Sequence, residues 1–366
     1  MSLRRFARRS LAAATLLLAA PFGLPGTQPS AQAADQPATI RIASPDLSAG
    51  PKPYAGSSTV SLVHIKQALE KEFEKDGIKV EWSFFKGAGP AVNEAFSNKQ
   101  IDFAYLGDLA AIIGRARGLD NRFLVGIRGS NTYLGAAPEA GIASLKDLKG
   151  KRVALFRGTA DQLAFGRALA EAGLGERDLK VVNLDWTASR AALAAGQVDA
   201  IWQGVPVLAL RERGLATVPA STKQIANKLA TTQSGLIGAS DFIQRYPQLT
   251  QRVVDVLVAE AHWAAQPANR ASVEESLSQQ GGIPLALIHG EYEGDDLAFR
   301  FSPRIDTFLR NSLADSVAQA KELGLIRQTF DTAAWVEPKF VEAALAKQNL
   351  QGFWPDYGKD GKAAAH

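Results

Sequence analysis

The sequence predicts an α/β protein of two lobes, each built on a mostly parallel sheet, with a hinge and a cleft between them. Three observations support this prediction. Expected strands and helices alternate from residue 39 to residue 127, the same order restarts at residue 133, and residues 197–204 repeat the pattern of residues 100–107. Such alternation is typical of parallel sheets covered by helices. A chain of 366 residues is also long enough for two domains of about 150 residues each.

Short apolar runs and helical spacing of apolar residues define the expected elements. In the first half, strands are expected at residues 39–43, 78–85, 101–105 and 122–127, and helices at 60–74, 90–98 and 108–117. In the second half, strands are expected at residues 133–137, 152–156, 180–184 and 199–202, and helices at 144–147, 160–172 and 188–195. Beyond Ser240 the chain is expected to be nearly all helical, with helices at 253–265, 273–279, 305–323 and 338–347.

An internal repeat indicates two similar lobes. Residues 100–107 read QIDFAYLG and residues 197–204 read QVDAIWQG, so that Asp102 and Asp199 occupy matching positions. A repeat at this distance predicts two lobes of about 100 residues each. We expect lobe 1 to comprise residues 34–128 and 232–350, lobe 2 residues 129–231, and a tail residues 351–366, frayed from residue 359 onward, with chain crossings near 128–132 and 228–235.

The N-terminus has the features of an export signal. Four arginines without any acid precede an apolar run of about ten residues, LAAATLLLAA, and Ala31-Gln32-Ala33 supplies small residues for a cleavage site. The run is too short to span a membrane, which takes roughly 20 residues. We expect residues 1–33 to be a signal peptide cleaved near Ala33/Ala34, by either the general or the twin-arginine route, which leaves a periplasmic protein.

Composition excludes several kinds of chemistry. The chain has no cysteine, which excludes disulfides, thiolate metal sites and a cysteine nucleophile. Its four histidines lie far apart, and neither a GxSxG elbow nor a GxxxxGK[ST] phosphate loop occurs. The net charge of +4 comes from the four arginines of the signal, so it does not indicate nucleic-acid binding. We therefore expect no cofactor, no metal, no nucleic-acid partner and no enzymatic activity.

Three segments at the carboxyl ends of expected strands are suited to hold an anion. They comprise Gly87, Ala88, Gly89 and Pro90; Leu106, Gly107 and Asp108; and Arg157, Gly158 and Thr159, where Thr159 and Gln162 have the spacing of a capping box. Each leads into a helix, and a helix N-terminus offers unpaired N–H groups and partial positive charge. Each segment taken alone is equally typical of an ordinary turn or cap.

Other candidate residues are open to two interpretations. Trp202 is either a ligand platform or part of the core, and Asp108 either stabilises the start of its helix or receives a ligand amine or hydroxyl. Lys52 and Tyr54 lie in the long loop of residues 44–58 and either reach into the cleft or are solvated.

The sequence resembles the solute-binding proteins of ABC importers for aliphatic sulfonates, taurine, sulfate esters and nitrate. The matching segments are KVEWSFFKGAGPAVNEAFSNKQIDFAYLGDLAAI (79–112), LKDLKGKRVALFRGTA (145–160), AALAAGQVDAIW (191–202) and DFIQRYPQL (241–249). The resemblance implies a periplasmic-binding-protein fold that closes about a hinge and delivers its ligand to a membrane permease and ATPase. It places ligand contacts on the three segments above and adds Trp202, Gln203 and Gln233.

The chain departs from this family in ways that bear on the ligand. Leu106 stands where a small hydroxyl residue is common, and Gln203-Gly204 replace a frequent aspartate-proline. These changes argue against taurine, whose amine requires an acid. We expect a monomer that binds an organosulfur oxyanion, an alkyl or aryl sulfonate or a sulfate ester. Binding is expected to be insensitive to pH between about 5.5 and 8, because no histidine lies in a candidate loop. The alternatives are nitrate, bicarbonate or a thiamine precursor as ligand, or a cysteine-free enzyme on the same fold.

Overall fold

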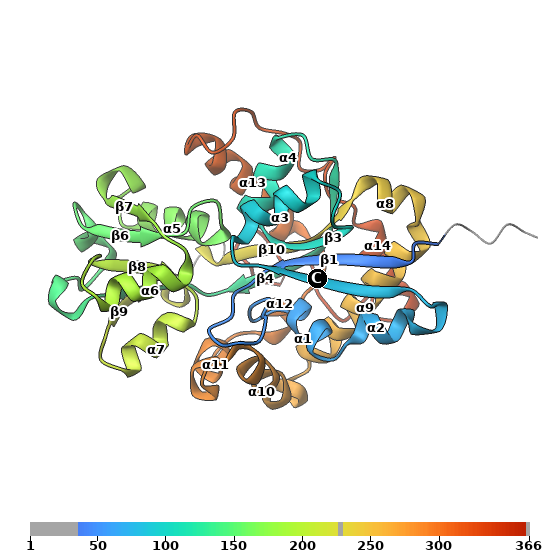
Figure 1. Ribbon diagram of the computed structural model, residues 1–366, viewed down its shortest axis with the longest axis horizontal. Coiled ribbons are helices and arrows are strands. Elements are labelled where there is room, and N and C mark those ends of the chain that lie inside the picture. The colour runs from blue at the N-terminus through green and yellow to red at the C-terminus, as the bar shows by residue number, and fades with distance from the viewer. Residues whose placement is uncertain (1–35, 226–229, 364–366) are drawn as a thin grey trace, which may run out of the picture. The chain divides into compact units, whose positions relative to one another are not determined.

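Two five-stranded sheets organise the part of the chain that the structure, a computed structural model, describes: residues 36–225 and 230–363 (Figure 1). The predicted signal peptide and its cleavage site at Ala33/Ala34 lie outside the described residues. Residues 37–366 form one compact unit. All strands and helices described below belong to it.

The two sheets have matching strand orders. The first contains β1 (Thr39–Pro45), β2 (Lys79–Phe85), β3 (Phe103–Gly107), β4 (Asn121–Ser130) and β10 (Thr232–Ala239), in the order β2-β1-β3-β10-β4. The second contains β5 (Tyr133–Ala136), β6 (Arg152–Leu155), β7 (Lys180–Asn183), β8 (Ala200–Gln203) and β9 (Thr217–Ser221), in the order β7-β6-β8-β5-β9. Strand β10 is antiparallel to both of its neighbours, and β5 likewise. The other four strands of each sheet therefore run the same way, which confirms the mostly parallel prediction.

The internal repeat corresponds to the same Arg–Asp interaction, which occurs once in each sheet. Asp102, just before β3, accepts hydrogen bonds from the backbone N–H of Arg41 at 2.8 Å and from its Nη2 at 2.6 Å. Asp199, just before β8, accepts the same pair of bonds from Arg152, both at 2.7 Å. Each aspartate fixes the start of its own strand to the neighbouring parallel strand. The repeat thus marks equivalent strands in the two sheets.

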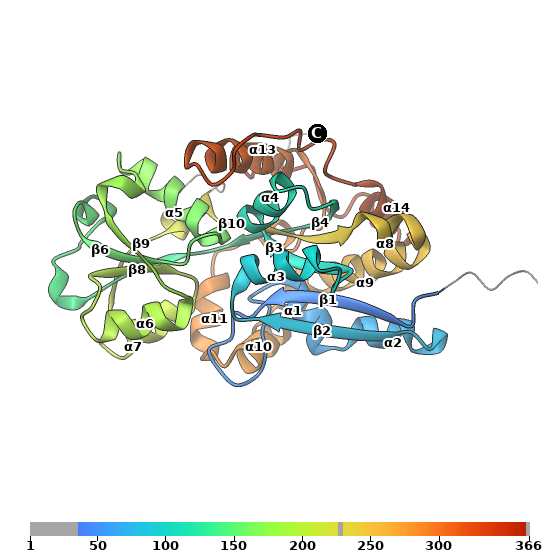
Figure 2. The ribbon, with the colours of Figure 1, turned by 45° about the horizontal axis from the view of Figure 1, so that its top comes forward.

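Helices cover both faces of the first sheet. The described helices are α1 (Thr59–Ile65), α2 (Ala68–Phe73), α3 (Ala88–Ser97), α4 (Asp108–Ala116), α5 (Ala160–Glu171), α6 (Trp186–Ala194), α7 (Pro206–Glu212), α8 (Ser240–Arg245), α9 (Pro247–Ala265), α10 (Arg270–Gly281), α11 (Leu285–Tyr292), α12 (Leu297–Arg300), α13 (Thr307–Glu322) and α14 (Lys339–Lys347). Figures 1 and 2 show α3, α4 and α13 on one face of the first sheet and α1 and α9 on the other. Strand β3 alternates accordingly: Phe103 and Tyr105 join the core beneath α1 and α9, and Ala104 and Leu106 join the core beneath α4 and α13.

The structure differs from the sequence prediction in several elements. The helix expected at 60–74 is broken into α1 and α2 at Gln67, whose φ is 51°. Strands β9 and β10 and helix α7 were not predicted. Strand β10 reads TQSGLIGA, and its Gly235 leaves room for the Phe123 ring, which a Cβ there would meet at 2.1 Å. The first part of the expected tail packs on the fold, because Trp354 and Tyr357 are buried and the carbonyl of Tyr357 accepts a hydrogen bond from the N–H of Phe308.

The chain passes between the sheets twice. It enters the second sheet at Asn131–Thr132, between β4 and β5, and returns between β9 and β10. We propose that each sheet, with the helices that cover it, forms one lobe, with the boundaries expected from the sequence. The membership of the strands supports this division, since β1 to β4 and β10 share one sheet and β5 to β9 share the other.

The two Arg–Asp pairs give a prediction about stability. The side chain of Asp102 is 7% exposed, whereas that of Asp199 is 23% exposed. We expect Asp102→Asn to lower the free energy of unfolding by about 1.5–3 kcal/mol, because it weakens buried hydrogen bonds to a charged partner. The matched variant Asp199→Asn should lower it by less, since solvent screens the exposed pair. Equilibrium urea unfolding measures both. A larger loss in Asp199→Asn than in Asp102→Asn would contradict burial as the cause of the difference.

Candidate functional site

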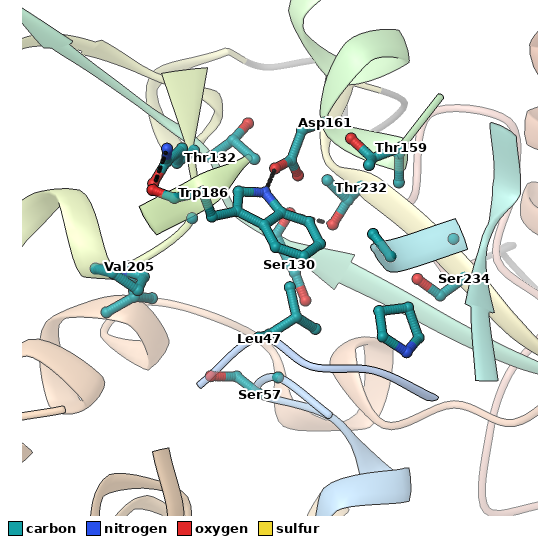
Figure 3. Close-up of a pocket in the computed structure, with 18 of the residues that line it drawn as sticks. Leu47, Ser57, Ser130, Thr132, Thr159, Asp161, Trp186, Val205, Thr232 and Ser234 are labelled. Carbon is teal, nitrogen blue, oxygen red and sulfur yellow. Dashed lines mark hydrogen bonds between the residues drawn. The ribbon is translucent and has the colours of Figure 1, made fainter. Parts of the chain in front are cut away.

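A cavity lies between the two sheets and receives side chains from both, with about 1000 Å³ of empty space including its open mouth. Its first-sheet side is formed by Pro45, Leu47, Tyr54, Gly56, Ser57, Ala88, Gly89, Tyr105, Gly107, Ala110, Ser234, Ile283 and Glu291. Its second-sheet side is formed by Thr159, Ala160, Asp161, Trp186, Arg190, Gln203, Gly204, Val205 and Pro206, and the crossing strands add Ser130, Asn131, Thr132 and Thr232. The lining combines hydroxyl groups with an apolar wall (Figure 3).

Three helix N-termini lie at this cavity. Helices α3, α4 and α5 begin after the N-cap residues Gly87, Gly107 and Thr159, and none of these N-caps accepts a hydrogen bond through its side chain. The first residues of α3 and α5, Ala88 and Ala160, line the cavity. Because the first N–H groups of a helix have no partner within the helix, these three ends provide donors and partial positive charge. The cavity is therefore suited to an anion.

Arg190 is the one basic side chain among the described residues that line the cavity. Its guanidinium donates to Gln203 Oε1 and to Thr187 Oγ1, both at 3.2 Å. It forms no ion pair within the described part of the chain, and burial lowers its pKa from the ordinary value. An arginine remains protonated after such a shift. Arg190 thus contributes a positive charge that no carboxylate among the described residues neutralises by direct contact.

Asp161 is the acid that stands among these donors. It lies in the first turn of α5, and its Oδ2 accepts a hydrogen bond from Trp186 Nε1 at 2.7 Å (Figure 3). Burial raises the pKa of Asp161 to about 6, the hydrogen bond from Trp186 opposes this shift, and the charge of Asp108 adds to it. The acid of this cavity therefore comes from α5, and not from the positions of Leu106 and Gln203, where the chain departs from its family.

Six of the residues expected to contact a ligand line the cavity: Tyr54, Ala88, Gly89, Gly107, Thr159 and Gln203. The capping box expected at Thr159 is not formed, because Gln162 bonds to the residue before the N-cap and the Thr159 side chain accepts no hydrogen bond from the first turn of the helix. Gln162 Oε1 accepts from the N–H of Gly158 at 2.9 Å, but the Thr159 hydroxyl donates to the carbonyl of Phe156 at 2.7 Å. The proton of that hydroxyl is already used, so Thr159 is placed to accept a hydrogen bond from a ligand rather than to donate one.

The remaining expected residues lie around the cavity without lining it. Leu106 is in the core of the first sheet, Gly87 and Pro90 are exposed, and Gly158 precedes the N-cap of α5. Lys52 is exposed, and Arg157 lies 3.6 Å from Glu176. Gln233 is fully buried and donates to Thr231 at 2.9 Å.

Two of the candidates left open by the sequence prove to be structural. Trp202 is 1% exposed and packs on Phe165 with ring centroids 5.0 Å apart, so its core interpretation holds. Asp108 is also buried; it accepts from the N–H of Leu109 and from Ser316 Oγ, both at 2.8 Å. It therefore joins α4 to α13 and does not face the cavity.

Trp186 and Arg190 line the cavity but were not expected from the sequence; they lie one turn apart on α6. A signal for them exists, because α6 follows β7 as the three candidate segments follow their own strands. Ligands of open α/β sheets bind beyond the carboxyl ends of the strands. Applied to β7 as well, that rule would have included residues 184–190. Asp161 could have been found in the same way, two residues after Thr159.

The two sheets have matching strand orders, each with one reversed strand. The chain crosses between them twice, and they enclose a cavity. These features define a two-lobe periplasmic-binding-protein fold. The chain belongs to the NMT1/THI5-like family, whose model matches residues 67–271. It is 32% identical over 241 residues to a protein of Escherichia coli K12 named "Putative aliphatic sulfonates-binding protein", an alignment that covers 64% of this chain and 71% of that protein.

Solved structures agree with this assignment. The periplasmic sulfonate-binding protein SsuA from Methylobacillus flagellatus KT superposes with a TM-score of 0.76 at 32% identity, over 89% of this chain and 98% of that one. The desulfurization enzyme DSZB shares the fold at 17% identity, with a TM-score of 0.62 over 85% of this chain and 99% of that one. Among the described residues, no helix is long and apolar enough to cross a membrane.

The close approach of α4 and α5 gives a prediction. A Cβ on Gly107 would lie 2.8 Å from the Cβ of Ala160 and 3.3 Å from its backbone nitrogen. Gly204 lines the same cavity, but a Cβ there would meet nothing nearer than 3.8 Å. We expect Gly107→Ala to lower the free energy of unfolding by about 1–3 kcal/mol, the usual effect of overpacking, and Gly204→Ala to change it little. Denaturant unfolding and solution scattering of both variants test this. Identical unfolding midpoints and radii of gyration would contradict the close approach.

Proposed function

We propose that this chain is the periplasmic substrate-binding component of an ABC importer, and that it binds an organosulfur oxyanion in the cavity between the sheets. The ligand is an alkyl or aryl sulfonate or a sulfate ester. One observation carries the proposal: three helix N-termini without side-chain caps and the Arg190 guanidinium surround one cavity that also has an apolar wall. A membrane permease and an ATPase are the partners of such a protein.

The chemistry of the cavity suits a sulfonate or sulfate-ester head group. Such a group keeps its charge at ordinary pH, and its oxygens accept several hydrogen bonds at once. A desolvated anion needs this compensation, and helix N–H groups and a guanidinium supply it. Leu47, Val205 and Ile283 provide apolar surface for the organic part. Nitrate or bicarbonate would fill only a small fraction of the empty space and would leave that surface exposed to water.

The relatives support a binding protein over an enzyme. The names of the Escherichia coli relative and of the Methylobacillus flagellatus structure both refer to sulfonate binding, and the latter also to the periplasm. The enzyme DSZB has the same fold at low identity, so the fold alone leaves both functions open. The cavity residues favour binding, since no cysteine or histidine is among those that the structure describes. The remaining acids are engaged, Asp161 with Trp186 and Glu291 with Arg300.

Calorimetric titration tests the proposal. The ligands are hexanesulfonate, a hexyl sulfate ester, nitrate, sulfate and bicarbonate. We expect both organosulfur anions to bind at least about tenfold more tightly than the inorganic ions, because only they use the apolar wall.

Arg190→Gln should weaken hexanesulfonate binding by roughly 10- to 150-fold, the loss of a hydrogen bond to a charged group. Arg157→Gln, on the exposed arginine beside Glu176, is the control and should leave binding unchanged. Tighter binding of nitrate than of either organosulfur anion would contradict the proposal.

The position of Asp161 replaces the expectation of pH-independent binding with a definite pH dependence. A charged Asp161 repels an anion in the same cavity, and a protonated one does not. Because burial raises the pKa of Asp161 to about 6, its charge appears as the pH rises through that value. Sulfonate affinity should therefore fall, by about three- to tenfold between pH 5 and pH 7.5. Titration of wild type and of Asp161→Asn across this range measures the effect. The variant should give a flat profile, and a flat wild-type profile would contradict the assignment.

A further inference from the structure

Trp186 is held in one orientation before any ligand arrives. It is the first residue of α6, whose start is fixed by the N-cap Asp185, which accepts a hydrogen bond from the N–H of Ala188 at 2.7 Å. The indole N–H donates to Asp161 at 2.7 Å. Phe156 and the indole ring pack in an edge-to-face arrangement, with centroids 5.0 Å apart and planes at 80°. A side chain fixed at its backbone, its polar atom and its ring loses little conformational freedom when a ligand binds.

The indole ring presents a flat apolar surface to the cavity. Figure 3 shows it extending across the cavity, with Leu47 beneath it, Val205 to one side and Asp161 above its nitrogen. Since Asp161 already accepts the N–H, the ring offers a ligand its π face and its carbon edge. Flexible aliphatic chains gain apolar contact from any such wall. A planar ring gains stacking in addition, in an offset or edge-to-face arrangement.

We propose that Trp186 makes the site selective for organosulfur oxyanions with a planar aromatic group, an aryl sulfonate or aryl sulfate ester, over those with a straight alkyl chain. This inference rests on the proposed function, because it places the charged head group at the helix N-termini and Arg190. Asp161 is a positioning residue in this arrangement, since it acts on the ligand through the orientation of the Trp186 ring. The platform role that sequence analysis considered for Trp202 belongs to Trp186.

The test compares benzenesulfonate and hexanesulfonate, which have the same head group and the same number of carbon atoms. Calorimetric titration of the wild-type protein should give about 3- to 10-fold tighter binding of benzenesulfonate, the effect of one aromatic contact. Trp186→Leu keeps an apolar side chain but removes the planar face. It should abolish the preference by weakening benzenesulfonate more than hexanesulfonate. Trp186→Phe restores a planar face without an N–H donor and should recover most of the preference.

Trp82 supplies a matched control outside the cavity. Its indole N–H donates to Glu70 at 3.1 Å and its ring meets the edge of His64 at 5.1 Å, so it repeats the bonding pattern of Trp186. Trp82→Leu should leave both affinities unchanged. Equal wild-type affinities, or a Trp186→Leu variant that keeps the preference, would overturn the inference and leave the proposed function standing. Failure of both sulfonates to bind the wild-type protein would overturn the proposed function itself. The wild-type comparison remains decisive if a variant does not fold.

Discussion

The buried carboxylate of Glu291 is the interaction on which the arrangement of the two sheets depends. Its Oε1 accepts from the backbone N–H of Asn131 at 3.0 Å and from Arg300 Nη1 at 3.0 Å, and its Oε2 accepts from the hydroxyl of Tyr133. Glu291 is 1% exposed, and a buried charge is stable only when it is paired and fully hydrogen-bonded. One side chain of α11 thereby fixes the crossing segment and the first residue of β5. Glu291 also lines the cavity, and its ion pair with Arg300, which Asp295 shares, weakens its repulsion of an anion there.

A second link between the sheets lies behind the cavity. Arg167 of α5, a helix of the second sheet, donates to Ser316 Oγ at 2.7 Å and pairs with Asp315 at 2.8 Å, both on α13. Ser316 in turn donates to Asp108 at the start of α4. This chain of contacts holds the N-termini of α4 and α5 close to each other. The crossing and this link together place helix ends from both sheets around one volume, which neither sheet provides alone.

Most of the fold could be predicted from the sequence, but fewer of the residues that line the cavity could, and the reasons are physical. Alternating periodicity predicted the strands that helices separate, and the repeat matched β3 with β8 because Asp102 and Asp199 perform the same local task. Strand β10 was missed because a central strand rich in Gly, Ser and Thr lacks the apolar signature of burial. At the site, successive side chains of β8 point to opposite faces, so Gln203 lines the cavity whereas Trp202 enters the core. A strand-end motif identifies the segment but not which of its residues faces the ligand.

Helix ends and side chains contribute different things to this cavity. The N-termini of α3, α4 and α5 attract any oxyanion, because their N–H groups and partial charges do not distinguish nitrate, sulfate and sulfonate by what lies beyond the oxygens. Discrimination must therefore come from groups that contact the rest of the ligand, and these include Trp186 on α6 and the apolar side chains of Leu47, Val205 and Ile283. Asp161 connects the two functions, since it stands in the first turn of α5 and holds the indole of α6. Its charge opposes the anion, whereas its hydrogen bond orders the apolar surface. A site built in this way gives up affinity for a bare anion and retains affinity for an anion with an organic group.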